Sequence, residues 1–142
     1  MRALLDVNVL IALFDLAHVH HARARRWWTA HRSLGWASCP ITQNGLVRII
    51  SKPGYARPVP LQTTLAALAT QLAQSDHQLW PDDISIVDGK VFDRSHILGP
   101  AQITDAYLLA LAVKNGGRLV TFDGRISSKA VRGAEARHLV AL

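Results

Sequence analysis

The sequence of 142 residues is poor in cysteine and contains no long apolar run. Cys39 is the only cysteine, so no disulfide can form within the chain, and we expect a reducing compartment. No apolar stretch approaches the roughly 18 residues that a membrane-spanning helix needs. The apolar start of the chain carries Asp6 and Asn8, which argues against a signal peptide. We therefore predict a soluble, cytoplasmic protein with no membrane partner.

Acidic residues are also scarce, and they are unevenly distributed. Glu135 is the only glutamate, and no acid lies between Asp15 and Asp76. The net charge of +6 favours polyanionic partners, such as nucleic acid, an acidic protein or an anionic membrane surface. The stretch without acids contains seven basic residues: Arg23, Arg25, Arg26, Arg32, Arg48, Lys52 and Arg57. The early half of the chain is thus positive, and most of the carboxylates lie elsewhere.

Short apolar segments alternate with helical segments along the chain. The predicted strands are Arg2–Asp6, Trp36–Cys39, Gln78–Trp80, Arg118–Phe122 and Ala136–Leu142. The predicted helices are Val7–Phe14, His18–His31, a helix opened by Thr42, Leu61–Gln74, Ile86–Ser95 and Ile103–Asn115, the last capped by Thr104. The connections are too long for hairpins, so we expect a parallel sheet with helices on both faces, built as a single domain over residues 1–142.

Three aspartates lie where parallel α/β sheets bind ligands, beyond the carboxyl ends of the strands. Asp6 ends the first predicted strand, Asp123 follows the fourth, and Asp105 lies in the first turn of the helix between them. Each has a simpler explanation: a helix cap for Asp6, an Asp-Gly turn for Asp123 and a favourable charge on the helix dipole for Asp105. Asp6 nevertheless lies in the apolar segment RALLDVNVLIAL, where an unpartnered carboxylate is strongly unfavourable.

Taken together, the three acids predict a metal site. Clustered carboxylates repel one another unless a cation lies between them, and Mg²⁺ prefers such oxygen ligands. A metal held in this way can polarise a phosphoryl oxygen and orient a water for in-line attack. Four basic residues are candidates for phosphate contact, or equally for plain solvated surface: Arg48, Lys52, Arg57 and Arg125. The pattern therefore favours metal-assisted chemistry at a phosphoryl group.

The segments LLDVNVLIALFD, CPITQNGLVRI and QITDAYLLALAVKNGGRLVTFD, in that order, resemble the PIN-domain family, and most closely VapC-type toxins. HVHHARARRWW and LWPDD add to this resemblance, which covers almost the whole chain. It implies a three-layer α/β sandwich with a central parallel sheet flanked by helices. It also implies an Mg²⁺- or Mn²⁺-dependent endoribonuclease that acts as the toxin of a toxin–antitoxin pair.

The resemblance also assigns roles to individual residues and names partners. The catalytic and metal-binding acids of the family correspond to Asp6, Asp105 and Asp123, and Asn8 and Thr104 match polar positions that orient ligands or water. A homodimer is implied, and so is a small VapB-type antitoxin whose C-terminal tail enters the active-site groove.

The central motif departs from the family at Gln43, where a glutamate is usual. An amide oxygen can still bind a cation or hold a water, but it carries no charge and cannot act as a base. We therefore expect a site with one metal ion and retained activity, with Gln43 beside the ligands.

Other functions stay open. The loss of charge at Gln43 is compatible with a PIN fold that binds RNA or an antitoxin without cutting. A phosphatase with an aspartyl nucleophile would need a second acid at the position of Asn8, which argues against that class. His18, His20 and His21 lack the spacing of a zinc hydrolase, so a polar surface is the better interpretation of this cluster.

Overall fold

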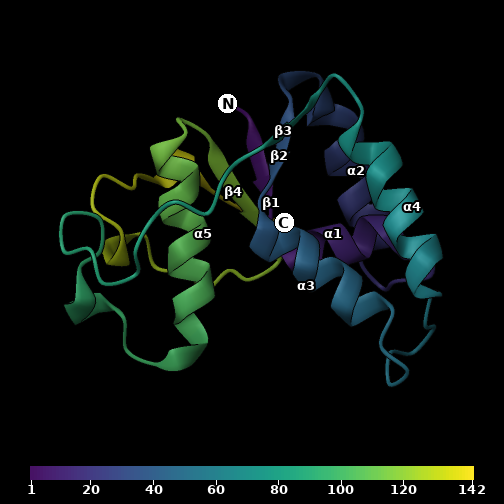
Figure 1. The fold of residues 1–142 in the computed structure, drawn as a ribbon. Helices are drawn as coiled ribbons and strands as arrows, with labels where there is room; N and C mark the ends of the chain where they lie inside the picture. The colour runs from purple at the N-terminus through teal and green to yellow at the C-terminus, as the bar shows by residue number, and fades with distance from the viewer.

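A computed structural model describes all 142 residues, and Figure 1 shows a central sheet with helices on both sides. Five parallel strands form the sheet in the order β3-β2-β1-β4-β5. The strands are β1 (Ala3–Leu5), β2 (Trp36–Ser38), β3 (His77–Leu79), β4 (Arg118–Thr121) and β5 (Leu139–Ala141). From β1 the chain builds outward to β3 and then crosses to β4, so the topological switch point lies between β1 and β4.

Helices α1 to α4 cover one face of the sheet, and α5 covers the other (Figure 1). Their bounds are α1 (Val7–Phe14), α2 (His21–His31), α3 (Pro40–Ile50), α4 (Leu61–Leu72) and α5 (Ile103–Lys114). Five short 3-10 helices complete the chain: Arg32–Leu34, Arg94–His96, Pro100–Gln102, Ser128–Ala130 and Ala136–His138. None of these helices combines the length and the apolar character that crossing a bilayer requires.

Successive side chains of the central strands point to opposite faces of the sheet, and so they pack against the helices on both sides. Leu4 and Leu119 pack into the apolar cluster around α5, whereas Leu5 and Val120 pack against the helices of the opposite face. All four side chains are completely buried, and each stabilises the fold by about 1.5–3 kcal/mol relative to an exposed position. The predicted three-layer α/β sandwich with a parallel central sheet is thus confirmed.

The prediction of a helix over Ile86–Ser95 was wrong. This segment consists of turns, an isolated bridge between Phe92 and Val131, and the start of a 3-10 helix. The Asp88 carboxylate accepts the Lys90 N–H, and that of Asp93 accepts the Ser95 N–H. Such local hydrogen bonds give the backbone N–H groups of a turn their acceptors, and they replace the bonds that a helix would form.

Two predicted helix starts are also corrected. α3 begins at Pro40, and Thr42 lies in its first turn, where its hydroxyl accepts the Cys39 N–H in a capping box. Thr104 does not cap α5, because the helix begins at Ile103 and is entered directly from the preceding 3-10 helix. In both cases the threonine lies inside the first turn of the helix rather than at its N-cap.

Candidate metal site

Asp6 is fixed at the carboxyl end of β1, in the centre of the sheet. It caps α1: one carboxylate oxygen, Oδ1, accepts the Val7 N–H at 2.7 Å. The other, Oδ2, accepts the Thr121 hydroxyl at 2.6 Å. The residue is only 7% exposed, and burial raises the pKa of its carboxyl, an effect that the bonds from Thr121 and Val7 oppose. A buried carboxylate at the switch point is thereby held in one orientation.

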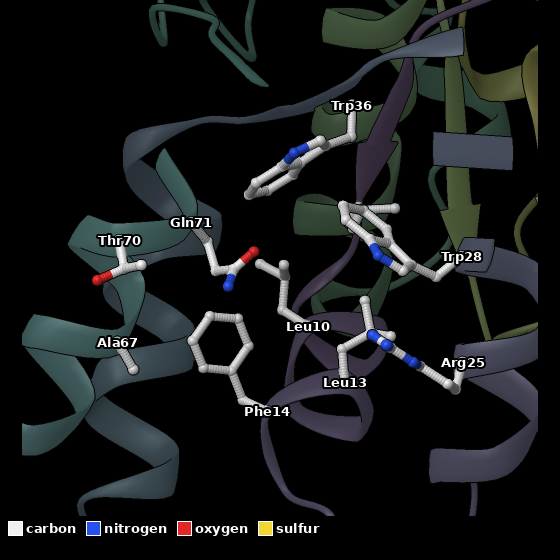
Figure 2. A pocket seen from close by; sticks show the side chains of 10 residues that line it. Leu10, Leu13, Phe14, Arg25, Trp28, Trp36, Ala67, Thr70 and Gln71 are labelled. Carbon is white, nitrogen blue, oxygen red and sulfur yellow. The ribbon is translucent and has the colours of Figure 1, made fainter. Parts of the chain in front are cut away.

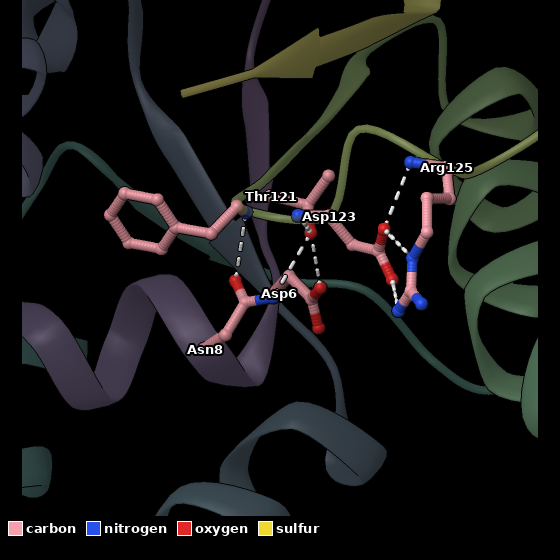
Figure 3. Close-up of polar contacts among 6 residues, drawn as sticks. Asp6, Asn8, Thr121, Asp123 and Arg125 are labelled. Atoms are coloured by element: carbon pink, nitrogen blue, oxygen red, sulfur yellow. Dashed lines mark hydrogen bonds and ion pairs between the residues drawn. The ribbon is translucent and has the colours of Figure 1, made fainter. Parts of the chain in front are cut away.

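Thr121, the last residue of β4, links the ends of β1 and β4 (Figure 3). Besides donating to Asp6, its hydroxyl oxygen accepts the Asp123 N–H at 3.0 Å and the Asn8 side-chain amide at 3.1 Å. Asn8 in turn accepts the Phe122 N–H through Oδ1 at 3.2 Å. Asn8 thus lies beside the acids, and it orients the backbone that carries Asp123.

The sequence interpretation did not identify Thr121 as a site residue. The available signal was its place at the end of a buried strand, two residues before Asp123 in the segment VTFD. A polar side chain at the end of a parallel strand lies near the edge where ligands bind. On this ground Thr121 could have been predicted as a site residue together with Asp123.

Asp123 follows β4 and is engaged by Arg125. Its Oδ1 accepts the backbone N–H of Arg125 at 2.8 Å and the guanidinium Nε at 3.0 Å, and Oδ2 accepts Nη2 at 2.9 Å. Figure 3 shows the Asp123 carboxylate turned toward this guanidinium. These bonds lower the pKa of the Asp123 carboxyl to about 2.

Asp105 projects from the first turn of α5, and no side chain or backbone group donates a hydrogen bond to its carboxylate. Its pKa is raised, first by partial burial and then by the negative charges of Asp6 and Asp123. Asp105 and Asp123 also line a common cavity of about 190 Å³, together with Gln102, Arg125 and other residues. The structure therefore brings the three acids to one edge of the sheet, where they repel one another.

This donor set suits a hard divalent cation, because it consists of carboxylate oxygens whose mutual repulsion a cation would relieve. In the structure, no group of three or more acidic, histidine or cysteine side chains is arranged to hold a metal ion. The Asp123 carboxylate binds Arg125 instead. For the three acids to share one ion, Asp123 must give up this partner.

Gln43 and Thr104 do not join this cluster. The Gln43 amide donates to the Ser38 hydroxyl at 2.9 Å, and Ser38 in turn contacts Nε2 of His77 at 2.8 Å. Thr104 is exposed, and its side chain makes no hydrogen bond to the acids. Gln43 therefore belongs to a network between the end of β2 and the start of β3, on the far side of β1 from β4.

The four basic candidates have different surroundings. Arg57 binds the buried Asp15 through Nη2 at 2.8 Å, so its charge is already committed to the fold. Arg48 and Lys52 are exposed and form no ion pair. Arg125 is the candidate that lies directly at the acids.

A second, larger cavity of about 360 Å³ lies between α1, α2 and α4 (Figure 2). Trp28 and Trp36 form one side, and Gln71 of α4 lies on the other. Its lining is mostly apolar and includes none of the three aspartates. It therefore offers no group that could activate a water, and the candidate site remains at the ends of β1 and β4.

The family model described as "PIN domain" matches residues 3–132. The sequence is 54% identical over 142 residues to Ribonuclease VapC44 of Mycobacterium tuberculosis, and this match covers 100% of both chains. It is 45% identical over 137 residues to Ribonuclease VapC39 of the same organism, covering 94% of this chain and 96% of the relative.

Solved structures share the fold at much lower sequence identity. Mycobacterium tuberculosis VapC20, a Sarcin-Ricin loop cleaving toxin, superposes with a TM-score of 0.62 at 15% identity over 87% of this chain and 91% of that one. A chain of VapBC2 from Rickettsia felis, solved with a DNA fragment from its promoter, gives 0.60 at 15% identity over 87% and 89%. At 15% identity, this likeness shows the fold alone.

Proposed function

Because the chain belongs to the PIN-domain family and is a ribonuclease toxin of the VapC type, we propose that Asp6, Asp105 and Asp123 hold one Mg²⁺ or Mn²⁺ ion for RNA hydrolysis. The observation that carries this proposal is the convergence of three carboxylates at one edge of the sheet: Thr121 links Asp6 to the backbone of Asp123, Asp105 and Asp123 line one cavity, and the charges of Asp6 and Asp123 raise the pKa of Asp105. Arg125 offsets part of the repulsion among these charges, and a divalent cation would convert it into attraction.

When bound, the ion would polarise the scissile phosphate and lower the pKa of an attacking water. The chain's own residues prepare the place for it. Thr121 and the start of α1 hold Asp6 in one orientation, and Asn8 fixes the backbone before Asp123. Asp105 has no competing hydrogen bond and is free to bind the ion. A ligand whose orientation is fixed by hydrogen bonds, as that of Asp6 is, binds a metal ion more tightly than a mobile one.

The amide at Gln43 argues for a single ion. Its side chain donates to Ser38 and brings no charge to the three acids. A second ion would need a carboxylate at this position, and the amide of Gln43 does not provide one. We therefore assign one metal ion to the site, with Asn8 and Thr121 as its supporting polar residues and Thr104 at its exposed rim.

The biological setting forms part of the same proposal. We place the protein in the cytoplasm as a single PIN domain over residues 1–142 that acts as a homodimer. A small VapB-type antitoxin would inhibit it, which the similarity to a chain of VapBC2 supports. Arg48 and Lys52, exposed and unpaired, are candidates for contact with the RNA backbone.

Cleavage of total RNA by the purified protein tests this function. We expect fragments with Mg²⁺ or Mn²⁺, none with EDTA, and at least about a 100-fold slower reaction for Asp6→Asn, since changes in supporting residues alone cost up to that factor. Asparagine can still accept the Val7 N–H, so the fold should survive. Equal cleavage with EDTA, or by Asp6→Asn, would contradict the metal assignment.

The same assay separates the enzyme from a module that only binds RNA or an antitoxin. A wild-type chain that binds RNA without cutting it, while Gln43→Glu cuts, would favour the binding module. If the wild type cleaves RNA and Gln43→Glu cleaves it at a similar rate, the enzyme with a single ion is favoured.

A further inference from the structure

Arg125 makes an unusually complete contact for so exposed a residue. Its side chain is 91% exposed, yet it engages both oxygens of the Asp123 carboxylate, and its backbone N–H adds a third bond. Most exposed ion pairs contribute little, and bidentate arginine–carboxylate pairs are the exception because the planar fork matches both oxygens. The interaction is local, between residues two positions apart, so it can form and break without changing the fold.

This contact competes directly with metal binding. Both oxygens of Asp123 are occupied by Arg125, whereas Asp105 is free of donors. A metal ion and a guanidinium are both attracted to one carboxylate and repel each other. The positive charge of Arg125 also acts on Asp105, whose raised pKa it partly lowers. Arg125 therefore supplies, in part, the charge that a cation would otherwise provide.

The freed guanidinium would remain at the site. Arg125 lines the same cavity as Asp105 and Asp123, so a phosphate next to the acids would lie within its reach. Guanidinium forks bind phosphate in the same bidentate manner as carboxylate. Arg125 thus has two suitable partners: the Asp123 carboxylate when no metal ion is bound, and a phosphate when the ion binds Asp123.

On the basis of the proposed metal-dependent function, we propose that Arg125 is a positioning residue that exchanges partners. It binds Asp123 while the metal is absent, and it binds a phosphate of the RNA when the metal takes Asp123. Metal and RNA then favour each other's binding, and by linkage the effect is reciprocal. The chain would thereby assemble its full site only when both are present.

Two affinities measured on the full chain test this exchange. Mn²⁺ binding is measured by calorimetry without RNA, and binding of a labelled, mixed-sequence 12-nucleotide RNA by fluorescence anisotropy in EDTA and in Mn²⁺, with RNA integrity checked on a gel. Arg125→Gln should bind Mn²⁺ about two- to five-fold more tightly than wild type, the range that an exposed ion pair provides. The factor by which Mn²⁺ raises RNA affinity should be smaller in Arg125→Gln than in the wild type, because only the direct attraction between the ion and the phosphate remains.

Two further variants complete the design. Lys90→Gln removes one exposed positive charge away from this cavity, and it should keep the wild-type Mn²⁺ affinity and coupling. Arg125→Lys retains the charge but not the fork, and it should recover part of the coupling. A purely structural role of Arg125 would change stability without changing how Mn²⁺ and RNA affect each other.

The results distinguish this inference from the proposed function. If the wild type binds Mn²⁺ and cleaves RNA, but Arg125→Gln shows unchanged or weaker Mn²⁺ affinity, the exchange is wrong and the nuclease assignment stands. The same holds if the coupling in Arg125→Gln equals that in the wild type. A wild type that neither binds Mn²⁺ nor cleaves RNA overturns both.

Discussion

Thr121 and Asp6 lie 115 residues apart in the sequence and are joined by a buried hydrogen bond of 2.6 Å. The bond exists because β1 and β4 are neighbours in register, with Leu5 opposite Val120, so the next residues meet at the strand ends. One hydroxyl therefore sets the position of the central acid and, through the Asp123 N–H, of the loop that carries another.

Thr121→Val should damage both the fold and the activity. Valine has nearly the same shape but leaves Asp6 Oδ2, Asn8 Nδ2 and the Asp123 N–H each without a partner. We expect a loss of about 1–3 kcal/mol in the free energy of unfolding and a 10- to 100-fold decrease in RNA cleavage, roughly as for other residues that orient metal ligands. Urea unfolding and a cleavage assay measure the two effects. Thr121→Ser, which keeps the hydroxyl, should retain most of the activity, and a Thr121→Val chain as active as wild type would contradict this role.

Asp105→Asn should separate stability from activity. The pKa of Asp105 is raised, so its charged form destabilises the folded chain at neutral pH, and this unfavourable contribution disappears when the residue is neutral. Because solvent screens part of the repulsion, the gain in unfolding free energy in EDTA should stay below about 1 kcal/mol. RNA cleavage should nevertheless be lost. The control is Asp83→Asn, an exposed acid paired with Lys114, which should keep full activity. A destabilised Asp105→Asn chain would show that the charge is already compensated.

Gln43→Glu should make stability depend on pH through His77. Nδ1 of His77 contacts the Leu72 carbonyl, which requires a hydrogen on Nδ1, so Nε2 accepts the Ser38 hydroxyl and Ser38 accepts the Gln43 amide. A glutamate cannot donate to Ser38. The network is then satisfied only if His77 is protonated, which raises its pKa in the folded variant above that in the folded wild type, where burial lowers it.

A group with a raised pKa stabilises the fold at low pH and loses that contribution as the pH rises through it. Gln43→Glu should therefore lose about 1–2 kcal/mol at pH 8 and less at pH 5.5, measured by urea unfolding against the wild type. Gln43→Met, which removes the donor without adding a charge, should lose the same amount at both values. An equal loss for Gln43→Glu at both pH values would speak against the network.

Asp15 should contribute to the acid limb of the stability profile. The bond from Arg57, followed by those from Tyr55 and the Ala17 N–H, lowers the pKa of its carboxyl from 3.8 to about 2. The stabilisation is therefore complete above the unfolded value and is lost as the pH falls toward 2.

Asp15→Asn should flatten the decrease in unfolding free energy between pH 4 and pH 2, measured by urea titrations across this range. Arg57→Gln should instead move the decrease to higher pH, because it removes the largest cause of the shift. Unchanged profiles in both variants would show that this ion pair does not stabilise the fold.

Much of the fold was predictable from local patterns. Short apolar segments between helical ones indicated each strand, and the parallel sheet followed from connections too long for hairpins. The error at Ile86–Ser95 has a local cause, since Asp88 and Asp93 close turns with their own side chains. Composition alone did not distinguish those turns from a helix.

The sequence by itself determined which residues carry the charge of the site. Asp6, Asp105 and Asp123 follow strands or open a helix, and such ends meet at one edge of any parallel sheet. Only the tertiary structure decided their partners. That Thr121 binds Asp6, that Gln43 binds Ser38 and that Arg125 occupies Asp123 depends on strand register and side-chain orientation. A hydrogen bond is decided within a few tenths of an ångström, and no spacing along a chain specifies distances that finely.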